Sequence, residues 1–489
     1  MKTRNKLLII SIFIQFSTSV YCQYDVFKQV ENYYLQSHDT LKIRILKFLE
    51  DNVDIHYSRV YYWQDSLRNK VEFDELSFED YNASKLKLSE LKRVNKVKPV
   101  FYNIPDRKNI TKEQLIKTID SGVNNWGKPW NKNLKFDDFC NYLLPYRSQN
   151  EPLEDWVNIF ENRFSAISGN NCAEICNNVN TNLSKWFLCS FAYENRSEGN
   201  YMLSPSQMFF RKEGLCEDMC NLSVYSMRTL GLPVSIDFTP AWATSSYNHM
   251  WCTYIDEDGT HRPFEAITGL SNNFVIFREP GKVFRITYCN QSSSLANKID
   301  NDAIPFGHLR KKNIIDVTNE YWPTSSINCR LFAVPSQNKI SYISVFNSLR
   351  WIPVDWGKVN NDNVLFKNLS IGSVYLPINY EKGQIIVASN PVLIKSDKEK
   401  IELIPNYNNL ISVKLFEKPK YLIYRIGKKY TFLYWDKKWI NAGEKQATES
   451  KELIFDKIPS NTIYLLIPEY SQKKERIFTI NDNNELEYW

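Results

Sequence analysis

Residues 214–266 constrain the fold more than any other stretch, because their order predicts one helix followed by three strands. The helix is predicted from Cys216 to about Leu230, since Gly231 and then Pro233 follow it, which is the usual order at a helix end. The predicted strands are Val234–Phe238, His249–Asp256 and His261–Ala266. Asp258-Gly259, between the last two strands, is a pair typical of hairpin turns. The middle of the chain is therefore predicted to be α+β.

Mainly helical patterns precede this stretch, from about residue 24 to residue 200. Thr111 and Gln114 fit a capping box, and Ile110 and Leu115 are placed as a hydrophobic staple. The whole chain has 489 residues, more than one hydrophobic core usually holds. We expect a signal peptide at 1–22, a helical N-terminal region at 23–165, a central domain at 166–330, and β modules at 335–395 and 396–489.

An internal repeat in the C-terminal third predicts two related small β-sandwich modules. The marker residues are Trp351, Phe366 and Tyr375 in the first copy and Trp439, Phe455 and Tyr464 in the second. The Trp-to-Phe steps are 15 and 16 residues, and the Phe-to-Tyr step is 9 residues in both copies. A chance alignment of β-rich sequence is the alternative interpretation.

The extreme N-terminus has the order of charges and apolar residues that export requires. Lys2, Arg4 and Lys6 precede an apolar run, Leu7–Phe16, that is too short to span a bilayer. Cleavage after Cys22 is expected, and a lipid anchor on Cys22 is disfavoured because the preceding residue, Tyr21, is not small. A buried N-terminal helix is the weaker alternative. We expect an exported protein, periplasmic or extracellular, without a membrane span.

Composition is that of an ordinary folded protein, with 43% hydrophobic and 24% charged residues. The net charge of +6 is small for this length and no basic stripe stands out, so no nucleic-acid partner is expected. The 13 Trp, 29 Tyr and 28 Phe favour packed β cores. A carbohydrate- or peptide-contacting surface is the other use of such residues, so glycan contact by the β modules stays open.

Nine cysteines remain after removal of Cys22, at positions 140, 172, 176, 189, 216, 220, 252, 289 and 329. An odd number in an exported protein leaves at least one thiol outside any complete set of disulfides, and that thiol is a candidate nucleophile. Several of the nine are equally well explained as buried thiols. Spacings such as Cys172 to Cys176 and Cys216 to Cys220 are wider than structural zinc knuckles, so no metal or other cofactor is expected.

Cys216, His249 and Glu265 form the constellation best suited to catalysis. Cys216 lies where a glycine turn leads into a helix, and the positive end of a helix together with a nearby imidazole stabilises a thiolate. A carboxylate on the neighbouring strand accepts the other imidazole N–H and orients the ring. In an antiparallel hairpin, residues that face each other have numbers with a constant sum. Glu265 is expected about opposite His249, because their sum is nearly that of the turn positions 256 and 259.

This order resembles the transglutaminase-like branch of the papain-like cysteine enzymes, whose motifs are Gly-x-Cys, a Leu-Arg-x-x-Gly-Ile-Pro-like helix exit, His-x-Trp and a later acidic residue. The matching pieces are Gly214-Leu215-Cys216, Met227–Pro233, His249-Met250-Trp251 and Glu265, within residues 200–270. Segments 139–147 and 316–321 are also similar to exported transglutaminase-like proteins of gut Bacteroidetes. The family usually has Asp, often followed by Pro, where this chain has Glu265-Ala266.

The resemblance implies a papain-type α+β core, with a helical N-terminal region and C-terminal β-sandwich modules, that carries a Cys-His-Glu triad. It implies acyl transfer or hydrolysis on an amide of a peptide, protein or glycoconjugate. The N–H of Cys216 is the expected oxyanion donor, with Gln207 as a second candidate. Open alternatives are His261 for His249, Asp256 or Asp258 for Glu265, and a disulfide from Cys216 to Cys220 or Cys252. A non-catalytic envelope protein that binds glycan or protein is the competing function.

Overall fold

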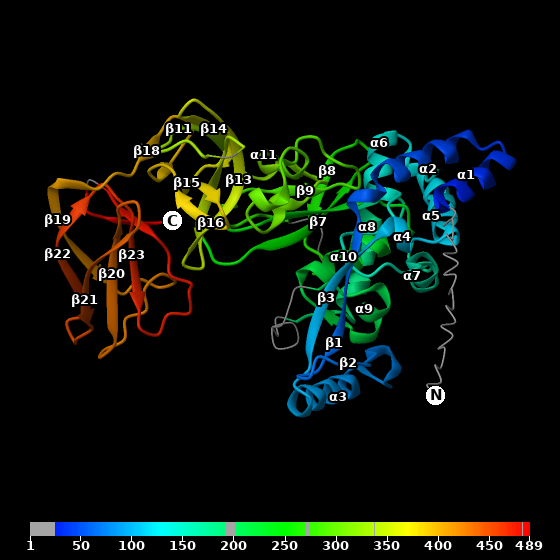
Figure 1. Ribbon diagram of the computed structural model, residues 1–489, viewed down its shortest axis with the longest axis horizontal. Helices are drawn as coiled ribbons and strands as arrows, with labels where there is room; N and C mark the ends of the chain where they lie inside the picture. Colours follow the sequence, from blue (N-terminus) through cyan, green and yellow to red (C-terminus); the bar gives the residue numbers. More distant parts are fainter. Residues whose placement is uncertain (1–24, 191–200, 269–273, 337, 482) are drawn as a thin grey trace, which may run out of the picture.

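A computed structural model describes residues 25–190, 201–268, 274–336, 338–481 and 483–489. The chain is mixed α+β, with helices and small sheets in the N-terminal half and many-stranded antiparallel sheets in the C-terminal part (Figure 1). The predicted signal peptide lies outside the described residues. Within those residues, no helix combines the length and the apolar character that crossing a membrane requires.

The N-terminal helices α1 (Val26–Gln36), α2 (Thr40–Asn52) and α5 (Lys112–Trp126) share one hydrophobic core. The predicted capping box is confirmed, since Thr111 caps the N–H of Gln114 and the Gln114 side chain returns the bond to Thr111. Ile110 and Leu115 are both buried in that core, as the staple predicts. The other helices before the centre are α3 (Tyr81–Val94), α4 (Asp106–Asn109), α6 (Phe136–Asp138), α7 (Trp156–Phe164) and α8 (Cys172–Ser184).

A three-stranded antiparallel sheet interrupts this region, which the sequence predicted to be mainly helical. Its strands are β1 (Tyr57–Gln64), β2 (Lys70–Val71) and β3 (Lys98–Pro105), in the order β2-β1-β3. β1 is rich in aromatic residues, which favour strands, yet its partner β3 lies more than thirty residues away in the chain. Such pairing leaves no local turn signal, so the sequence did not predict this small sheet in an otherwise helical region.

The predicted central helix and strands are confirmed. Helix α9 (Pro205–Arg211) leads through β5 (Glu213–Gly214) into α10 (Cys216–Thr229). α10 ends before Gly231, whose φ is +85°. It packs on an antiparallel sheet with the order β10-β9-β6-β7-β8. The strands are β6 (Val234–Thr239), β7 (His249–Ile255), β8 (His261–Phe264), β9 (Phe284–Ile286) and β10 (Ile314–Asp316).

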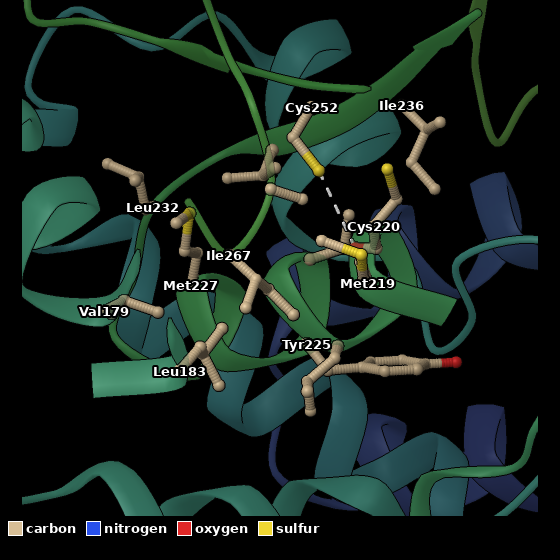
Figure 2. Packing of buried hydrophobic residues seen from close by; sticks show 14 of the residues in the cluster. Val179, Leu183, Met219, Cys220, Tyr225, Met227, Leu232, Ile236, Cys252 and Ile267 are labelled. Carbon is tan, nitrogen blue, oxygen red and sulfur yellow. Dashed lines mark hydrogen bonds between the residues drawn. The ribbon is translucent and has the colours of Figure 1, made fainter. Parts of the chain in front are cut away.

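Burial of α10 anchors the centre of the molecule. Every residue from Asp218 to Thr229 is buried. Figure 2 shows Met219, Tyr225 and Met227 of this helix packed among Leu183 of α8 and Ile236 of β6. A fully buried aliphatic side chain of this kind stabilises the fold by about 1.5–3 kcal/mol. The first residue of α10, Cys216, is therefore held at the end of a rigid, deeply packed element.

The β7–β8 hairpin differs from the predicted register by two positions. Ile255 pairs with His261 and Cys252 with Phe264, so continuing the ladder would place Glu265 opposite Trp251 rather than opposite His249. The reason is the turn, in which the N–H of Asp256 bonds the carbonyl of Thr260 rather than of Gly259. Gly259 adopts a left-handed φ of +77°, as in a three-residue hairpin loop.

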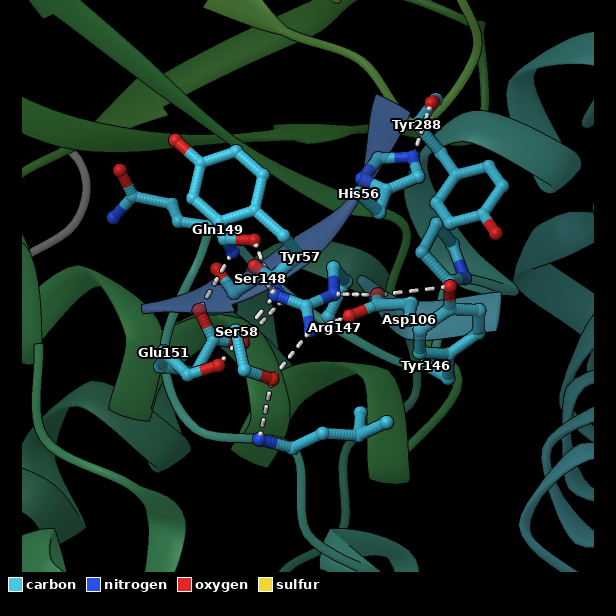
Figure 3. Close-up of polar contacts among 12 residues, drawn as sticks. His56, Tyr57, Ser58, Asp106, Tyr146, Arg147, Ser148, Gln149, Glu151 and Tyr288 are labelled. Carbon is cyan, nitrogen blue, oxygen red and sulfur yellow. Dashed lines mark hydrogen bonds and ion pairs between the residues drawn. The ribbon is translucent and has the colours of Figure 1, made fainter. Parts of the chain in front are cut away.

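A buried polar network centred on Arg147 joins the N-terminal region to the centre (Figure 3). Its guanidinium donates to both carboxylate oxygens of Asp106, at 2.5 and 2.6 Å, and to the hydroxyl of Ser58 at 3.2 Å. Arg228 of α10 donates in turn to the carbonyl of Arg147 at 2.8 Å. Arg147 and Asp106 are both excluded from solvent, so removing either partner would strongly destabilise the fold.

The strands from β11 onwards form two sets with the same pairing scheme, which we call the first and second β modules. The first contains β11 (Thr324–Arg330), β12 (Ile340–Asn347), β13 (Arg350–Asn360), β14 (Asn363–Ser370), β15 (Ser373–Glu381), β16 (Gln384–Val387), β17 (Val392–Ile394) and β18 (Lys400–Glu402). The second contains β19 (Asn406–Phe416), β20 (Lys429–Trp435), β21 (Trp439–Gln446), β22 (Glu452–Ser460), β23 (Tyr464–Pro468), β24 (Phe478–Ile480) and β25 (Leu486–Tyr488). In each module the second strand lies between the third and the fifth, and the first strand pairs with the fourth.

The repeated tryptophans lie where the two modules meet. In both copies the strand that contains the repeated tryptophan has a β-bulge, in which one residue has no partner on the neighbouring strand. This residue is Val354 in β13 and Ala442 in β21. Trp351 contacts Trp435 with ring centroids 5.5 Å apart, and Phe346 contacts Trp439 at 5.6 Å. Because equivalent positions contact each other reciprocally, the interface has the self-complementary pattern of a twofold dimer within one chain.

Candidate active site

Cys216, His249 and Glu265 come together from three different elements. Cys216 is the first residue of α10, His249 is the first residue of β7, and Glu265 follows the last residue of β8. Nε2 of His249 lies 3.0 Å from Oε2 of Glu265, and the side chain of Cys216 is close enough to the same imidazole to raise its pKa. Since Nε2 faces the carboxylate, Nδ1 is the ring nitrogen left for the thiol.

The imidazole is biased towards its charged form. Burial lowers the pKa of His249, but the hydrogen bonds to Cys216 and Glu265 and their charges outweigh burial and raise the pKa to about 9. At neutral pH the ring is therefore an imidazolium beside the sulfur. A positive charge next to a thiol favours the thiolate.

The start of α10 is fixed by a buried carboxylate that the sequence analysis missed. Asp218 accepts from the N–H of Leu215 at 2.9 Å and from the N–H of Leu203 at 3.0 Å. A Cβ added to Gly214 would lie 2.7 Å from Cβ of Asp218, so only glycine fits at that position. An acidic residue two places after Cys216, in the first helical turn, is the sequence signal that predicts such a cap.

The first N–H groups of α10 point out of the helix end without an intrahelical acceptor. The N–H of Cys216 can therefore donate to the oxyanion that forms on a carbonyl group attacked by the sulfur. Gln207 is differently placed from the sequence prediction. Its Oε1 accepts from the N–H of Ser204 at 2.9 Å, and its Nε2 donates to Glu75 at 2.5 Å. Gln207 thereby acts as a helix cap on α9 rather than as an oxyanion donor.

The rival residues lie elsewhere. His261 pairs with Ile255 at the far end of β7, about 20 Å along the strand from His249. Burial, reinforced by the charge of Arg285, lowers the pKa of His261 to about 4. Asp256 accepts from the N–H groups of the hairpin turn and pairs with Arg262 at 2.6 Å. These residues serve the hairpin and not the site.

The thiols next to Cys216 in sequence and space are core residues. Cys220 and Cys252 are buried, and Sγ of Cys252 donates to the carbonyl of Cys220 at 3.7 Å (Figure 2). Burial raises the pKa of Cys220 well above its usual range. All nine cysteines in the described part of the chain carry free thiols, and Cys216 is partly exposed. Within the same residues, no three His, Cys, Asp or Glu side chains are grouped to hold a metal ion.

Two tryptophans frame the imidazole. The ring centroid of Trp242 lies 6.3 Å from that of His249, and the centroid of Trp251 lies at 5.9 Å. Trp251 is completely buried, which agrees with a packing role. The side chains of His249 and Glu265 keep 31% and 34% of their surface exposed, so water reaches the site.

Comparison with known proteins adds little. No family model matches the sequence, and no curated protein matches it. Among solved structures, red sea bream transglutaminase aligns with 82% of this chain and 78% of its own chain, at 9% identity and a TM-score of 0.21. A score this low carries no argument about function. The chain therefore has a weak structural similarity to a transglutaminase.

Proposed function

We propose that this protein is an exported cysteine-dependent hydrolase or acyltransferase, built on a papain-type core, that acts on amide bonds of a peptide, protein or glycoconjugate. The observation that carries the proposal is the 3.0 Å contact of His249 with Glu265, together with the side chain of Cys216, which raises the pKa of the same imidazole. Its geometry combines a thiol at a helix N-terminus, a charged imidazole and an orienting carboxylate.

The groups are suited to acyl chemistry in two steps. The thiolate of Cys216 attacks the amide carbon, and the developing oxyanion is stabilised by the N–H of Cys216. Protonated His249 gives its proton to the leaving amine, the C–N bond breaks, and a thioester remains on the sulfur. A second nucleophile then loses its proton to His249 and attacks the thioester, which releases the acyl product and the thiolate. Glu265 holds the ring throughout.

Water is the favoured second nucleophile. The site is not enclosed, because His249 and Glu265 each keep about a third of their side-chain surface exposed. Transfer to an amine requires that water be excluded, and the described residues form no such barrier around these two side chains. We therefore favour hydrolysis over cross-linking.

Alkylation by iodoacetamide as a function of pH tests the proposal. Cys216 is expected to react near pH 6 faster than a free thiol, because its thiolate is paired with His249. Cys289 is a matched control, since it is also partly exposed but burial raises its pKa. The rapid phase should disappear in Cys216→Ala and persist in Cys289→Ser. A wild-type rate near pH 6 no higher than that of a free thiol would exclude the enzyme.

A binding role is a second candidate, supported by a cleft of about 220 Å³ in the second β module. Tyr421, Tyr470 and Tyr488 line it together with the cations Lys420, Arg425 and Lys474. Aromatic faces and cations suit an acidic glycan. Glycan-array binding by the full chain, lost in Tyr421→Ala and retained in Cys216→Ala, would support a non-catalytic envelope protein. Absence of binding would remove this candidate.

A further inference from the structure

The loop of residues 240–248 joins β6 to β7 and therefore delivers His249 to the site. It closes on itself where the N–H of Trp242 bonds the carbonyl of Tyr247 at 3.1 Å. Tyr247 has a φ of +70°, a left-handed backbone that residues with a side chain seldom adopt. Such a conformation persists only where surrounding contacts impose it.

Asn347, the last residue of β12 in the first β module, imposes it. Its Nδ2 group donates to the carbonyls of Trp242, Ser245 and Tyr247 at 2.8–2.9 Å, so three acceptors share its two hydrogens. Its Oδ1 accepts from the N–H of Tyr247 at 3.0 Å. Both backbone groups of the left-handed residue are thus bound by one side chain, which is itself buried.

Arg476, just before β24 in the second β module, holds the same loop from the other side. Its guanidinium donates to the carbonyls of Ala243 and Ser245, the latter at 3.2 Å. It also donates to the carbonyl of Phe346 at 2.8 Å and to the backbone oxygen of Trp489 at 2.7 Å. In the described part of the chain no Asp or Glu side chain pairs with this buried cation, so backbone oxygens are its partners.

We infer that Asn347 and Arg476 are positioning residues that set His249 for reaction with Cys216, so that the two β modules complete the site. This inference rests on the proposed function. Without Asn347 the left-handed turn at Tyr247 keeps only the bond from the N–H of Trp242 to its carbonyl, and the loop relaxes towards ordinary backbone. Because His249 follows two residues later, its ring would then lose alignment with the sulfur and with Glu265.

Full-length Asn347→Ala and Arg476→Gln test this, with Asn379→Ala as the matched control. Asn379 is equally buried in the first β module, but its Nδ2 donates to the carbonyl of Ala333 at 3.3 Å and not to the loop of residues 240–248. In both test variants the imidazole pKa of His249, followed by NMR, should fall from about 9 towards 6.5. Alkylation of Cys216 near pH 6 should slow about tenfold or more, while the control retains wild-type values.

A purely structural role would lower the melting temperature in all three variants without moving the titration of His249. That result in folded Asn347→Ala and Arg476→Gln would overturn the inference. Should Asn347→Ala fail to fold, Arg476→Lys decides, because it keeps the charge but lacks the fork that binds two carbonyls. Its His249 pKa is expected to fall part of the way, and an unchanged value would contradict the role.

Both readouts need no substrate, so the inference and the proposed function fail separately. If wild-type Cys216 reacts slowly, the enzyme is excluded, yet the His249 titration still reports whether Asn347 positions the ring. With an active substrate, a positioning role predicts a lower kcat at nearly constant KM. A rise in KM alone would place Asn347 in binding and contradict the assignment.

Discussion

Glu265 accepts a hydrogen bond from His249 although it lies one residue beyond the end of β8 and two positions out of direct register. The contact depends on the length of the glutamate side chain, because the backbone ladder does not bring the two residues opposite each other. This explains why Glu rather than Asp suits the position in this hairpin.

Shortening that carboxylate is expected to break the contact. Glu265→Asp places the oxygens about 1.5 Å farther back, the length of one C–C bond. Glu265→Gln keeps the reach but removes the charge. In both variants the pKa of His249 should fall from about 9 towards 6.5, because Glu265→Asp loses the hydrogen bond and Glu265→Gln loses the charge. NMR titration of the imidazole measures it, and an unchanged pKa in both variants would show that Glu265 does not govern the ring.

The helix start should tolerate no side chain at position 214. Gly214→Ala would drive a Cβ to 2.7–2.8 Å from Asp218 and displace the carboxylate that fixes Leu215. Loss of Cys216 reactivity is expected together with lower stability. Gly259→Ala is the control, because its left-handed φ also strains alanine but its Cβ would meet open space at the hairpin tip. It should lower the melting temperature and leave Cys216 alkylation intact; equal effects on alkylation would contradict the local role of Gly214.

Buried Arg147 should be among the most sensitive positions for folding. Arg147→Met leaves Asp106 as an unpaired buried charge and is expected to reduce the free energy of unfolding by about 3–5 kcal/mol. Arg262→Met removes an exposed ion pair with Asp256 and should cost less than about 1 kcal/mol. Denaturant unfolding compares the two. Similar losses of unfolding free energy in the two variants would contradict a role of the Arg147 network in joining the N-terminal region to the centre.

Acid should destabilise the fold through His56. Burial, reinforced by the charge of Arg147, lowers its pKa from 6.5 to about 3, and the neutral ring donates from Nε2 to the carbonyl of Tyr288 at 2.8 Å. Between these pH values the unfolded chain binds a proton that the folded chain does not, so stability decreases as pH falls. This loss approaches about 1.4 kcal/mol per pH unit.

His56→Gln keeps an N–H donor for Tyr288 and removes the titration. The melting temperature of this variant should depend less steeply on pH between 6.5 and 3 than that of the wild type. His38→Gln, at an exposed position, is the control. A slope in His56→Gln equal to that of the wild type would rule out this source of acid sensitivity.

Local signals explain which elements could be predicted from sequence. The Gly231-Leu232-Pro233 exit and the Thr111 capping box act within a few residues, so α10 and α5 have the expected bounds. The predicted register of the β7–β8 hairpin was wrong, because one left-handed residue, Gly259, lengthens the loop. Sequence alone does not report the conformation that a glycine adopts.

Long-range contacts explain what could not be predicted. β1 and β3 pair without a connecting turn signal, and Asp218 is bound by Leu203 from fifteen residues away. Asn347 meets the loop before His249 from about a hundred residues away, and Arg476 from more than two hundred. Neither residue carries a local pattern that distinguishes it from other asparagines and arginines of the β modules.

The ionisation state of Cys216 tests the central claim most directly. The ultraviolet absorbance of the thiolate, taken as wild type minus Cys216→Ala across pH, measures it without substrate. Pairing with protonated His249 predicts that the thiolate is already present at pH 6 and that its absorbance changes little as the pH is raised further. A thiolate that forms only near pH ~8.5, as in free cysteine, would contradict the account.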